Sequence, residues 1–279
     1  MRKPAANSGH ADSPWQVVFS CSFPFTPRKT LHYTEPVLTL LARPVFLEPD
    51  HLKVKWLGES TDGERLAEFA GRLCYMSQKN PANRATRDYL ENIKKQGHGS
   101  VLEHANYSLL LEGVSRSLTH ELVRHRAGFA YSQLSQRYVD ESEANFVVPP
   151  AIVGDEDLEK EWRAQIDEAQ RCYVRLVEQL MERYGWVGDK VHRRKMSREA
   201  ARGVLPNSTE TKIVVTANAR AWRTMLELRS SEGAELEIRR CAVAMLKLLS
   251  KETPGFFSDF EIYQAEDRRE AARIVYHKV

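Results

Sequence analysis

The segment RHRAGFAYSQLSQRY, residues 124–138, is the most informative part of the chain. It opens with two arginines around a histidine, and cations in the last turn of a helix complement the helix dipole. Gly128 follows at a position typical of a helix C-cap. A helix end therefore explains the first part of the segment, but not residues 131–138.

Residues 131–138 contain one aliphatic side chain, Leu134, among amide, hydroxyl, aromatic and guanidinium groups. In an extended chain, Gln133, Ser135 and Arg137 lie on one side and Leu134 on the other. Arginine binds phosphate through a planar fork, and amides both donate and accept hydrogen bonds. Such a row suits a ligand with a phosphate and a flat ring that has carbonyl and N–H edges, which is typical of a nucleoside monophosphate.

Periodic apolar residues on both sides of this segment predict a mixture of strands and helices. We expect strands over 45–56, 106–114 and 211–217, and helices over 66–74, 85–96, 117–127, 155–184, from 218 onward and around 238–249. These elements predict one α+β domain over residues 44–265, with a sheet flanked by long helices. Residues 1–43 are expected to form a loose tail, and 266–279 a charged segment that frays or packs on a neighbouring subunit.

Composition limits the class of protein. The 279 residues are 42% hydrophobic and 28% charged, which is typical of a globular domain and excludes disorder as the main state. The net charge of +3 is too small to indicate an acidic polymer as partner. No apolar stretch approaches the length of a membrane-spanning helix, so we expect a soluble protein. The four cysteines have neither disulfide-framework nor metal-ligand spacing, which favours the cytoplasm.

Three familiar ligand motifs are excluded. His120 and His125 are five residues apart, about 140° around a helix, whereas a zinc-protease helix needs a separation of four. The glycines at 97 and 99 lack the third glycine of a dinucleotide fingerprint, and no phosphate loop occurs. We therefore predict no bound metal and no nucleotide site of these two kinds.

A second unusual block begins at Asn218, directly after the predicted strand 211–217. Asparagine is a good N-cap, and a helix N-terminus beside a strand end can bind an anion. Further along the same helix, Arg229 continues an apolar stripe and should be partly buried. A buried arginine needs an acceptor, which is either a ligand or an internal carboxylate such as Glu232 or Glu235. The sequence leaves both possibilities open.

These blocks resemble the flavin-dependent thymidylate synthases. The resemblance rests on Arg-His-Arg at 124–126 followed by Ser-x-Arg-Tyr at 135–138, and on Asn-Ala-Arg at 218–220 with Leu-Arg at 228–229. Residues 98–104 (HGSVLEH) and 201–206 (ARGVLP) are similar to two more family elements, and the similarity spans about residues 44–260. Eight residues separate Arg126 from Ser135 where the family has seven, and we expect a one-residue bulge within 127–130 to absorb the difference.

The resemblance implies a fold, a reaction and an assembly. The fold is a central, mostly antiparallel sheet flanked by long helices, with residues 44–265 as the catalytic domain. The reaction is reductive methylation of dUMP to dTMP, with methylenetetrahydrofolate as carbon donor and NADPH as reductant through FAD. The assembly is a homotetramer with shared active sites, which binds neither nucleic acid nor membrane.

The resemblance also assigns roles to individual residues. Arg229 is the catalytic residue, which contacts the uracil ring and helps it to ionise at N3. The residues implied for dUMP binding are Glu121, Arg124, Gln133, Ser135, Arg137, Arg202 and Arg229. The residues implied for FAD binding are His98, Ser100, Glu103, Arg124, His125, Arg126, Gln133, Asn218, Arg220 and Thr224. Thr224 replaces an amide of some members, and Gly233 stands where some have a histidine.

Other chemistries are open from the residues alone. A cysteine thiolate can activate uracil by adding to C6, but no cysteine here has the electropositive surroundings of a reactive thiolate. Ser135 could be a nucleophile, yet no general base accompanies it at a recognisable spacing. A basic helix end followed by tyrosines could bind nucleic acid. A flavoprotein of the same fold with a different acceptor is the remaining alternative.

Overall fold

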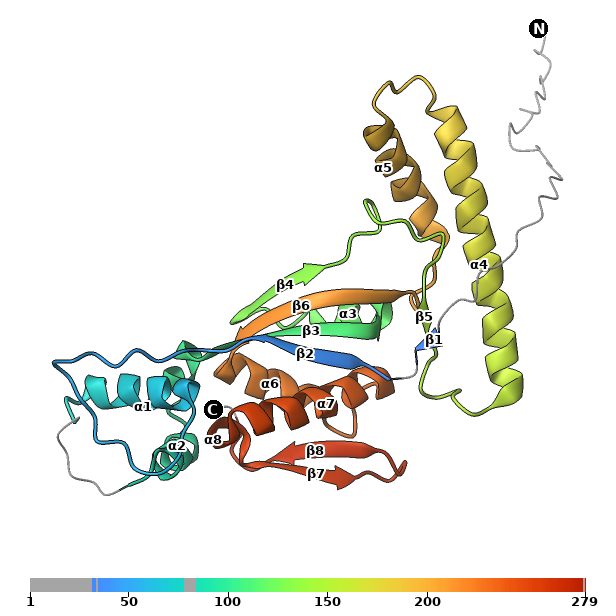
Figure 1. Cartoon of the computed structure of the whole chain (residues 1–279). Helices are drawn as coiled ribbons and strands as arrows, with labels where there is room; N and C mark the ends of the chain where they lie inside the picture. The colour runs from blue at the N-terminus through green and yellow to red at the C-terminus, as the bar shows by residue number, and fades with distance from the viewer. Residues whose placement is uncertain (1–31, 34, 78–83, 278) are drawn as a thin grey trace, which may run out of the picture.

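The computed structural model describes residues 32–33, 35–77, 84–277 and 279 (Figure 1). Its centre is a four-stranded antiparallel sheet in the order β2–β3–β6–β4. Strand β6 pairs with β3 on one side and with β4 on the other. The predicted α+β class and the mostly antiparallel sheet are confirmed. In the described part of the chain, no helix combines the length and apolar character needed to cross a membrane.

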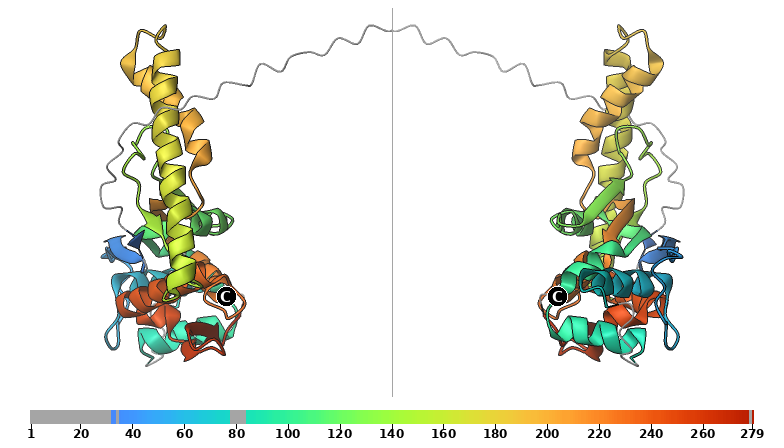
Figure 2. Two further views of the ribbon diagram at one scale, coloured as in Figure 1. Left: turned by 90° about the vertical axis from the view of Figure 1, so that its right-hand side faces the viewer. Right: turned by 90° about the vertical axis from the view of Figure 1, so that its left-hand side faces the viewer.

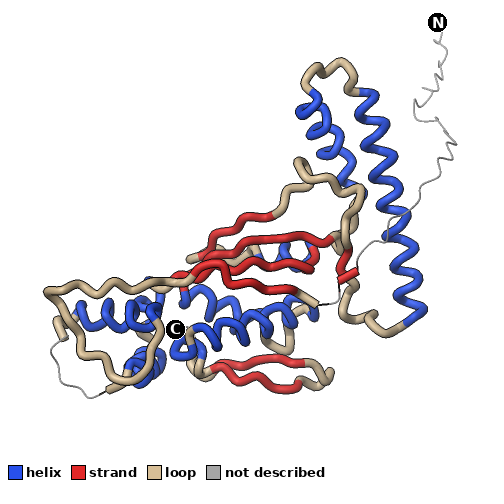
Figure 3. Tube along the Cα trace, viewed as in Figure 1, coloured by secondary structure: helices blue, strands red, loops and turns tan. Residues whose placement is uncertain are grey.

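The chain passes through strands and helices in mixed order, as Figure 3 shows in red and blue. The strands are β1 (His32–Tyr33), β2 (Val37–Ala42), β3 (Asn106–Ser115), β4 (Phe129–Gln133), β5 (Phe146–Val147), β6 (Glu210–Asn218), β7 (Phe260–Gln264) and β8 (Glu270–Ile274). The helices are α1 (Asp62–Cys74), α2 (Thr86–Lys95), α3 (Arg116–Leu122), α4 (Glu156–Arg183), α5 (Lys190–Ala201), α6 (Ala219–Arg229), α7 (Leu236–Glu252) and α8 (Pro254–Phe257). Two 3₁₀ helices cover Gly99–His104 and Arg202–Val204.

The main core lies between the sheet and helices α6 and α7, which run below it in Figure 1. Alternate residues of β6, Ile213, Val215 and Ala217, are at most 1% exposed, as expected for a strand with one buried face. They pack in one cluster with Trp222 and Met225 of α6. Burial of a large apolar side chain contributes roughly 1.5–3 kcal/mol, so this layer holds α6 firmly against β6.

Helices α4 and α5 form a hairpin that projects from one end of the sheet (Figure 2). The base of α4 packs on Phe146 through Ile166 and Trp162. Farther along, Gln170 donates to the carbonyl oxygen of Ser142 (3.0 Å). The long helix predicted over 155–184 is therefore present, but it extends away from the sheet along most of its length instead of covering it (Figure 1).

Three sequence predictions about the ends of the domain are wrong. No strand forms over 45–56; the edge strand is β2, Val37–Ala42, which pairs with β3. Order thus begins before residue 44, and 32–43 is not wholly a loose tail; residues 1–31 lie outside the described part. At the other end, β7 and β8 form a hairpin, so 266–279 is not simply a charged end that frays. Pairing of β2 with the distant strand β3 decides the first outcome, and the β7–β8 hairpin decides the second. Local alternation reveals neither pairing.

A buried ionic cluster joins α6, α2 and the residues after α8. Asp259 accepts hydrogen bonds from Arg223 Nη1 (2.6 Å) and Nη2 (2.9 Å) and from Lys94 Nζ (3.2 Å). The three side chains are at most 2% exposed. Burial alone would raise the pKa of Asp259, but the two cations outweigh it and hold that pKa below its ordinary value. The carboxylate therefore remains charged and neutralises cations that have left water.

We predict that Asp259→Ala lowers the free energy of unfolding by about 3–5 kcal/mol, because it leaves buried Arg223 without its anion and leaves buried Lys94 with only the exposed Glu91. Urea unfolding followed by circular dichroism measures the change. Glu168→Ala removes an exposed carboxylate that pairs with Arg171 and Arg175, and it should leave the unfolding midpoint nearly unchanged. Equal midpoints for the two variants would contradict this role of Asp259.

Candidate active site

The junction between β6 and α6 is built around Asn218. Its side-chain oxygen accepts from the backbone N–H of Ala221 (2.8 Å), which confirms the predicted N-cap. Gly128 lies against this cap with a φ of +77°. A Cβ at position 128 would lie 2.7 Å from Asn218 Nδ2 and 2.9 Å from the Ala221 Cβ. Only glycine fits here, and the segment 124–128 can therefore approach the start of α6 closely.

The extra residue between Arg126 and Ser135 does not form the expected bulge. A turn closes with a hydrogen bond from Phe129 N to Arg126 O (3.1 Å), and Gly128 provides its left-handed residue. From Phe129 to Gln133, β4 then pairs with β6 in unbroken register. Strand β4 is therefore regular and contains no bulge.

Helix α3 ends at Leu122, five residues earlier than predicted. The Tyr131 hydroxyl of β4 lies 2.9 Å from the carbonyl oxygen of Leu122 and 2.6 Å from that of His125. Carbonyl groups at a helix C-terminus lack partners within the helix, and a hydroxyl donor satisfies them. Tyr131 thus fastens the end of α3 to β4.

Arg229, at the last position of α6, is bound to the signature segment. Its Nη1 lies 2.5 Å from Glu121 Oε2, and its Nε donates to His125 Nε2 (3.0 Å). The side chain is 24% exposed, so it is partly buried as predicted. Arg229 therefore has an internal carboxylate partner, as one of the two alternatives predicted, but that partner is Glu121. The two glutamates named as examples have other roles: Glu235 caps α7, and Glu232 accepts from the backbone N–H of Glu266. In the described structure, no hydrogen bond engages Arg229 Nη2.

His125 is held in its neutral form by its surroundings. Burial lowers the pKa of His125, and the adjacent positive charge of Arg229 lowers it further. The hydrogen bond requires the same state, because Nε2 can accept from Arg229 only when it carries no proton. The pair therefore consists of a charged guanidinium and an uncharged imidazole.

The extended row predicted from Gln133 to Arg137 is only partly present. Gln133 ends β4, and its amide donates to the hydroxyls of Thr119 (3.1 Å) and Thr211 (3.3 Å). Beyond it the chain turns, and Ser135 Oγ accepts from the backbone N–H of Arg137 (3.4 Å). The Arg137 side chain reaches α5, where it pairs with Glu199 (2.9 Å). The prediction that the extended chain continues beyond residue 133 is therefore wrong.

Arg116 is a residue that the sequence reasoning missed. Its Nη2 donates to the Leu134 carbonyl (2.9 Å) and so positions the turn after β4. Burial lowers the pKa of Arg116, the nearby charge of Arg202 lowers it further, and Glu141 opposes both. The predicted residue Arg202 therefore lies near this turn and is itself exposed. A cation at the first position of α3 opposes the helix dipole, which is a signal that could have indicated a special role.

Several predicted flavin residues lie around the start of α6, whereas Gln133 lies toward the other end of β6, opposite Ile213. Arg220 Nη1 pairs with Glu103 Oε1 (2.6 Å), which joins α6 to the 3₁₀ helix that also carries Ser100. Thr224 donates to the Arg220 carbonyl (3.2 Å). At Gly99 a Cβ would lie 2.4 Å from the carbonyl carbon of Val279 and 3.0 Å from Arg220 Nε. The exposed members of this predicted set are His98, Ser100, Glu103, Arg124, Arg126 and Thr224.

The described cysteines are free thiols. Cys241 is fully buried in the main core, where burial raises its pKa to about 12. Cys172 lies on α4, and Cys74 is exposed at the end of α1. Cys21 lies outside the described residues.

Comparisons with known proteins identify the family of this chain. Residues 56–255 match the family described as thymidylate synthase complementing protein. A flavin-dependent thymidylate synthase from Mycobacterium sp. (strain JLS) is 48% identical over 241 residues, covering 84% of this chain and 93% of that protein. One from Mycobacteroides abscessus is 46% identical over 235 residues with the same coverage.

A solved structure with the same fold is the UMP/dUMP methylase PolB from Streptomyces cacaoi bound with 5-Br dUMP. The TM-score is 0.60 at 20% sequence identity, over 81% of this chain and 95% of that one. Fold and site thus define an α+β enzyme of the thymidylate synthase complementing class. The chain belongs to the flavin-dependent thymidylate synthase family.

We predict that Arg229→Gln raises the pKa of His125 toward its ordinary value, because removal of the neighbouring charge makes protonation easier. Burial should keep part of the depression. Titration of the imidazole proton by NMR measures the shift, with the resonance assigned by its loss in His125→Gln. Arg229→Lys retains the positive charge and serves as the control. An unchanged His125 pKa in the Gln variant would show that Arg229 exerts no field there.

Proposed function

We propose that this chain converts dUMP to dTMP by reductive methylation. Methylenetetrahydrofolate provides the carbon unit, and NADPH provides reducing equivalents through FAD. Membership of the flavin-dependent thymidylate synthase family supports the reaction class. The observation that carries the residue assignment is the geometry of Arg229, whose Nε and Nη1 are held by His125 and Glu121 while Nη2 stays available to a ligand.

Arg229 is proposed to activate the pyrimidine. The difficult step is to make uracil C5 nucleophilic, and loss of the N3 proton raises the electron density of the ring. A fixed cation at the carbonyl edge stabilises the resulting anion more strongly than water does, because the donor is already oriented. Glu121 and neutral His125 provide this orientation, since they hold two of the three guanidinium nitrogens.

The phosphate of dUMP is proposed to bind at the turn after β4. Arg137 and Arg202 provide positive charge there, and Ser135 provides a hydroxyl. Arginine forks suit phosphate oxygens, and Arg116 supports the turn through the Leu134 carbonyl. Glu199 now pairs with Arg137. The phosphate therefore has to displace Glu199 from Arg137 or share Arg137 with it. Gln133 retains its amide oxygen for a ring N–H. The remaining members of the proposed dUMP set are Glu121 and Arg124.

The donors near the start of α6 fit a flavin dinucleotide. Arg124 and Arg126 present exposed guanidinium groups suited to a diphosphate. Gly128 lets the backbone of their segment approach the start of α6 closely. When bound, FAD supplies the hydride. The chain's own residues hold and orient it; the proposed set is His98, Ser100, Glu103, Arg124, His125, Arg126, Gln133, Asn218, Arg220 and Thr224.

We also propose a cytoplasmic homotetramer with shared active sites. In the single chain, Arg124, Arg126 and Arg202 are exposed, although a site that stabilises an anion needs shielding from water. A neighbouring subunit would provide that cover. Sedimentation of the purified chain measures the assembly.

The chain should rescue a thymidine-requiring bacterium, and the purified protein should show a flavin absorption spectrum. Arg229→Ala should lower dTMP formation by at least about 10²-fold, because it removes the cation that stabilises the uracil anion, while the bound flavin largely remains. Chromatographic measurement of dTMP tests this, with Arg175→Ala on the exposed face of α4 as the control. Normal turnover of a folded Arg229→Ala enzyme would overturn the assignment.

Replacement of all four cysteines by alanine should leave turnover within about tenfold, equivalent to roughly 1.4 kcal/mol, because no thiolate takes part. Steady-state assays measure this, with thermal unfolding to account for the cavity left by Cys241. A complete loss of activity in a variant that still folds would instead support thiolate addition to uracil.

A further inference from the structure

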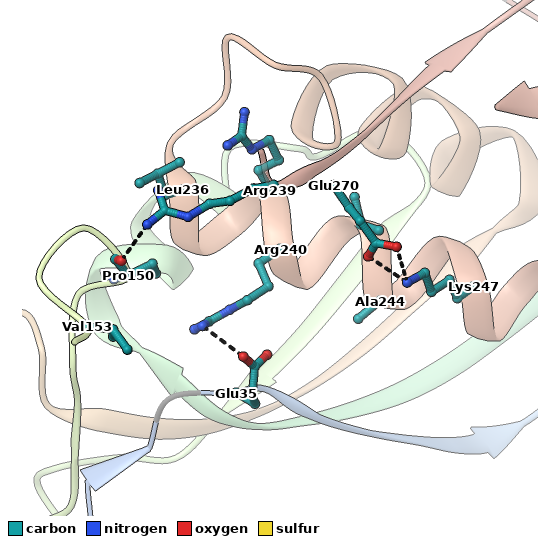
Figure 4. Close-up of a pocket in the computed structure, with 11 residues that line it drawn as sticks. Glu35, Pro150, Val153, Leu236, Arg239, Arg240, Ala244, Lys247 and Glu270 are labelled. Carbon is teal, nitrogen blue, oxygen red and sulfur yellow. Dashed lines mark hydrogen bonds and ion pairs between the residues drawn. The ribbon is translucent and has the colours of Figure 1, made fainter. Parts of the chain in front are cut away.

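A cavity of about 470 Å³ lies beside α7 (Figure 4), and none of the residues proposed for dUMP and flavin lines it. Its floor is one stripe of α7, and its walls come from three other segments: the chain before β2, the loop before α4, and the start of β8. The α7 residues are Leu236, Arg239, Arg240, Val243, Ala244 and Lys247, at helical spacing. A volume of this size is within the range of small-molecule sites.

The lining is predominantly basic. Four cations, Arg239, Arg240, Lys247 and Arg269, face two carboxylates, Glu35 and Glu270. Two of these cations already have partners. Lys247 lies 2.6 and 2.7 Å from the two oxygens of Glu270, and Arg239 donates to Asp267 and to a backbone carbonyl (3.1 Å). The less fully compensated charges therefore belong to Arg240, whose ion pair with Glu35 is long, and to Arg269.

Arg240 is poorly satisfied for a partly buried guanidinium. Its contact with Glu35 is long (3.4 Å), and that carboxylate is 72% exposed, so water competes for it. Its Nε and Nη2 are buried without any hydrogen-bond partner in the described structure. Unpaired buried donors are costly, and charged ones more so. A small rotation toward an anion in the cavity would satisfy them.

Arg269, directly before β8, lines the same cavity. One terminal nitrogen donates to the Pro150 carbonyl (3.0 Å), which anchors the side chain across the cavity. Within the part of the chain that the structure describes, it forms no ion pair with a carboxylate. Two guanidinium groups that lack a full anionic partner thus border one cavity, whose other walls include apolar Val153 and Val243.

We propose that this cavity binds a phosphorylated organic molecule of about the size of a nucleotide, with Arg240 and Arg269 holding the phosphate. The planar forks of arginine match phosphate oxygens, and two of them can bind one group from two sides. The apolar residues provide contact for the rest of the molecule. The chain's own first 31 residues do not complement this charge, because they carry four Lys and Arg against one Asp.

Calorimetry on the holoenzyme tests the proposal, with dUMP and FAD present at saturation so that their sites are occupied. Pyrophosphate and ATP are the two probes, and they separate the phosphate contribution from that of an attached organic part. We expect saturable binding of both probes, with the tighter binding for ATP. Arg240→Gln and Arg269→Gln should each weaken binding at least tenfold, while turnover of dUMP without probe stays at the wild-type level.

Arg273→Gln is the matched control. Arg273 lies on β8, is exposed and pairs with Glu261, and it does not line the cavity. It should bind both probes like the wild type. The proposal is overturned if neither probe binds saturably up to millimolar concentration, or if Arg240→Gln and Arg269→Gln bind both probes as tightly as Arg273→Gln. ATP binding no tighter than pyrophosphate would overturn the organic part of the assignment.

Discussion

The pairing of β6 with both β3 and β4 is the constraint on which the site depends. Because β4 lies directly beside β6, the signature segment is held next to the strand that leads into α6. Asn218 caps that helix, and Gly128 permits the two segments to touch. Strand pairing therefore aligns segments that are far apart in sequence along β4 and β6, with Gly128 and Asn218 at the end where α6 begins and Gln133 toward the other end.

The contact of Arg229 with Glu121 and His125 completes this arrangement, because it connects the end of α6 to the end of α3. A charged arginine beside a carboxylate and a neutral imidazole is oriented before any ligand arrives. Such orientation is the main requirement for stabilising a developing negative charge. The account thus explains activation of a pyrimidine without a thiolate, and it agrees with the buried, inert state of Cys241.

The sequence predicted the fold class, most helices and the N-cap at Asn218, because each depends on local periodicity or on one side chain. It failed where strand pairing or a distant partner decides the structure. Strand β2 and the β7–β8 hairpin are stabilised by pairing that no local pattern reveals. The partner of Arg229 is Glu121, 108 positions away, rather than a nearby glutamate. Arg116 was missed because its function is to bind a backbone carbonyl, and carbonyl groups leave no sequence signal.

The most direct test of the account is a crystal structure of the holoenzyme with 5-bromo-dUMP, in which anomalous scattering locates the bromine on C5. The account predicts that a carbonyl oxygen of the same ring lies within hydrogen-bond distance of Arg229 Nη2, about 2.7–3.2 Å. Glu121 and His125 should still hold the other two nitrogens. A structure in which Arg229 contacts only Glu121 and His125, with the pyrimidine bound elsewhere, would contradict it.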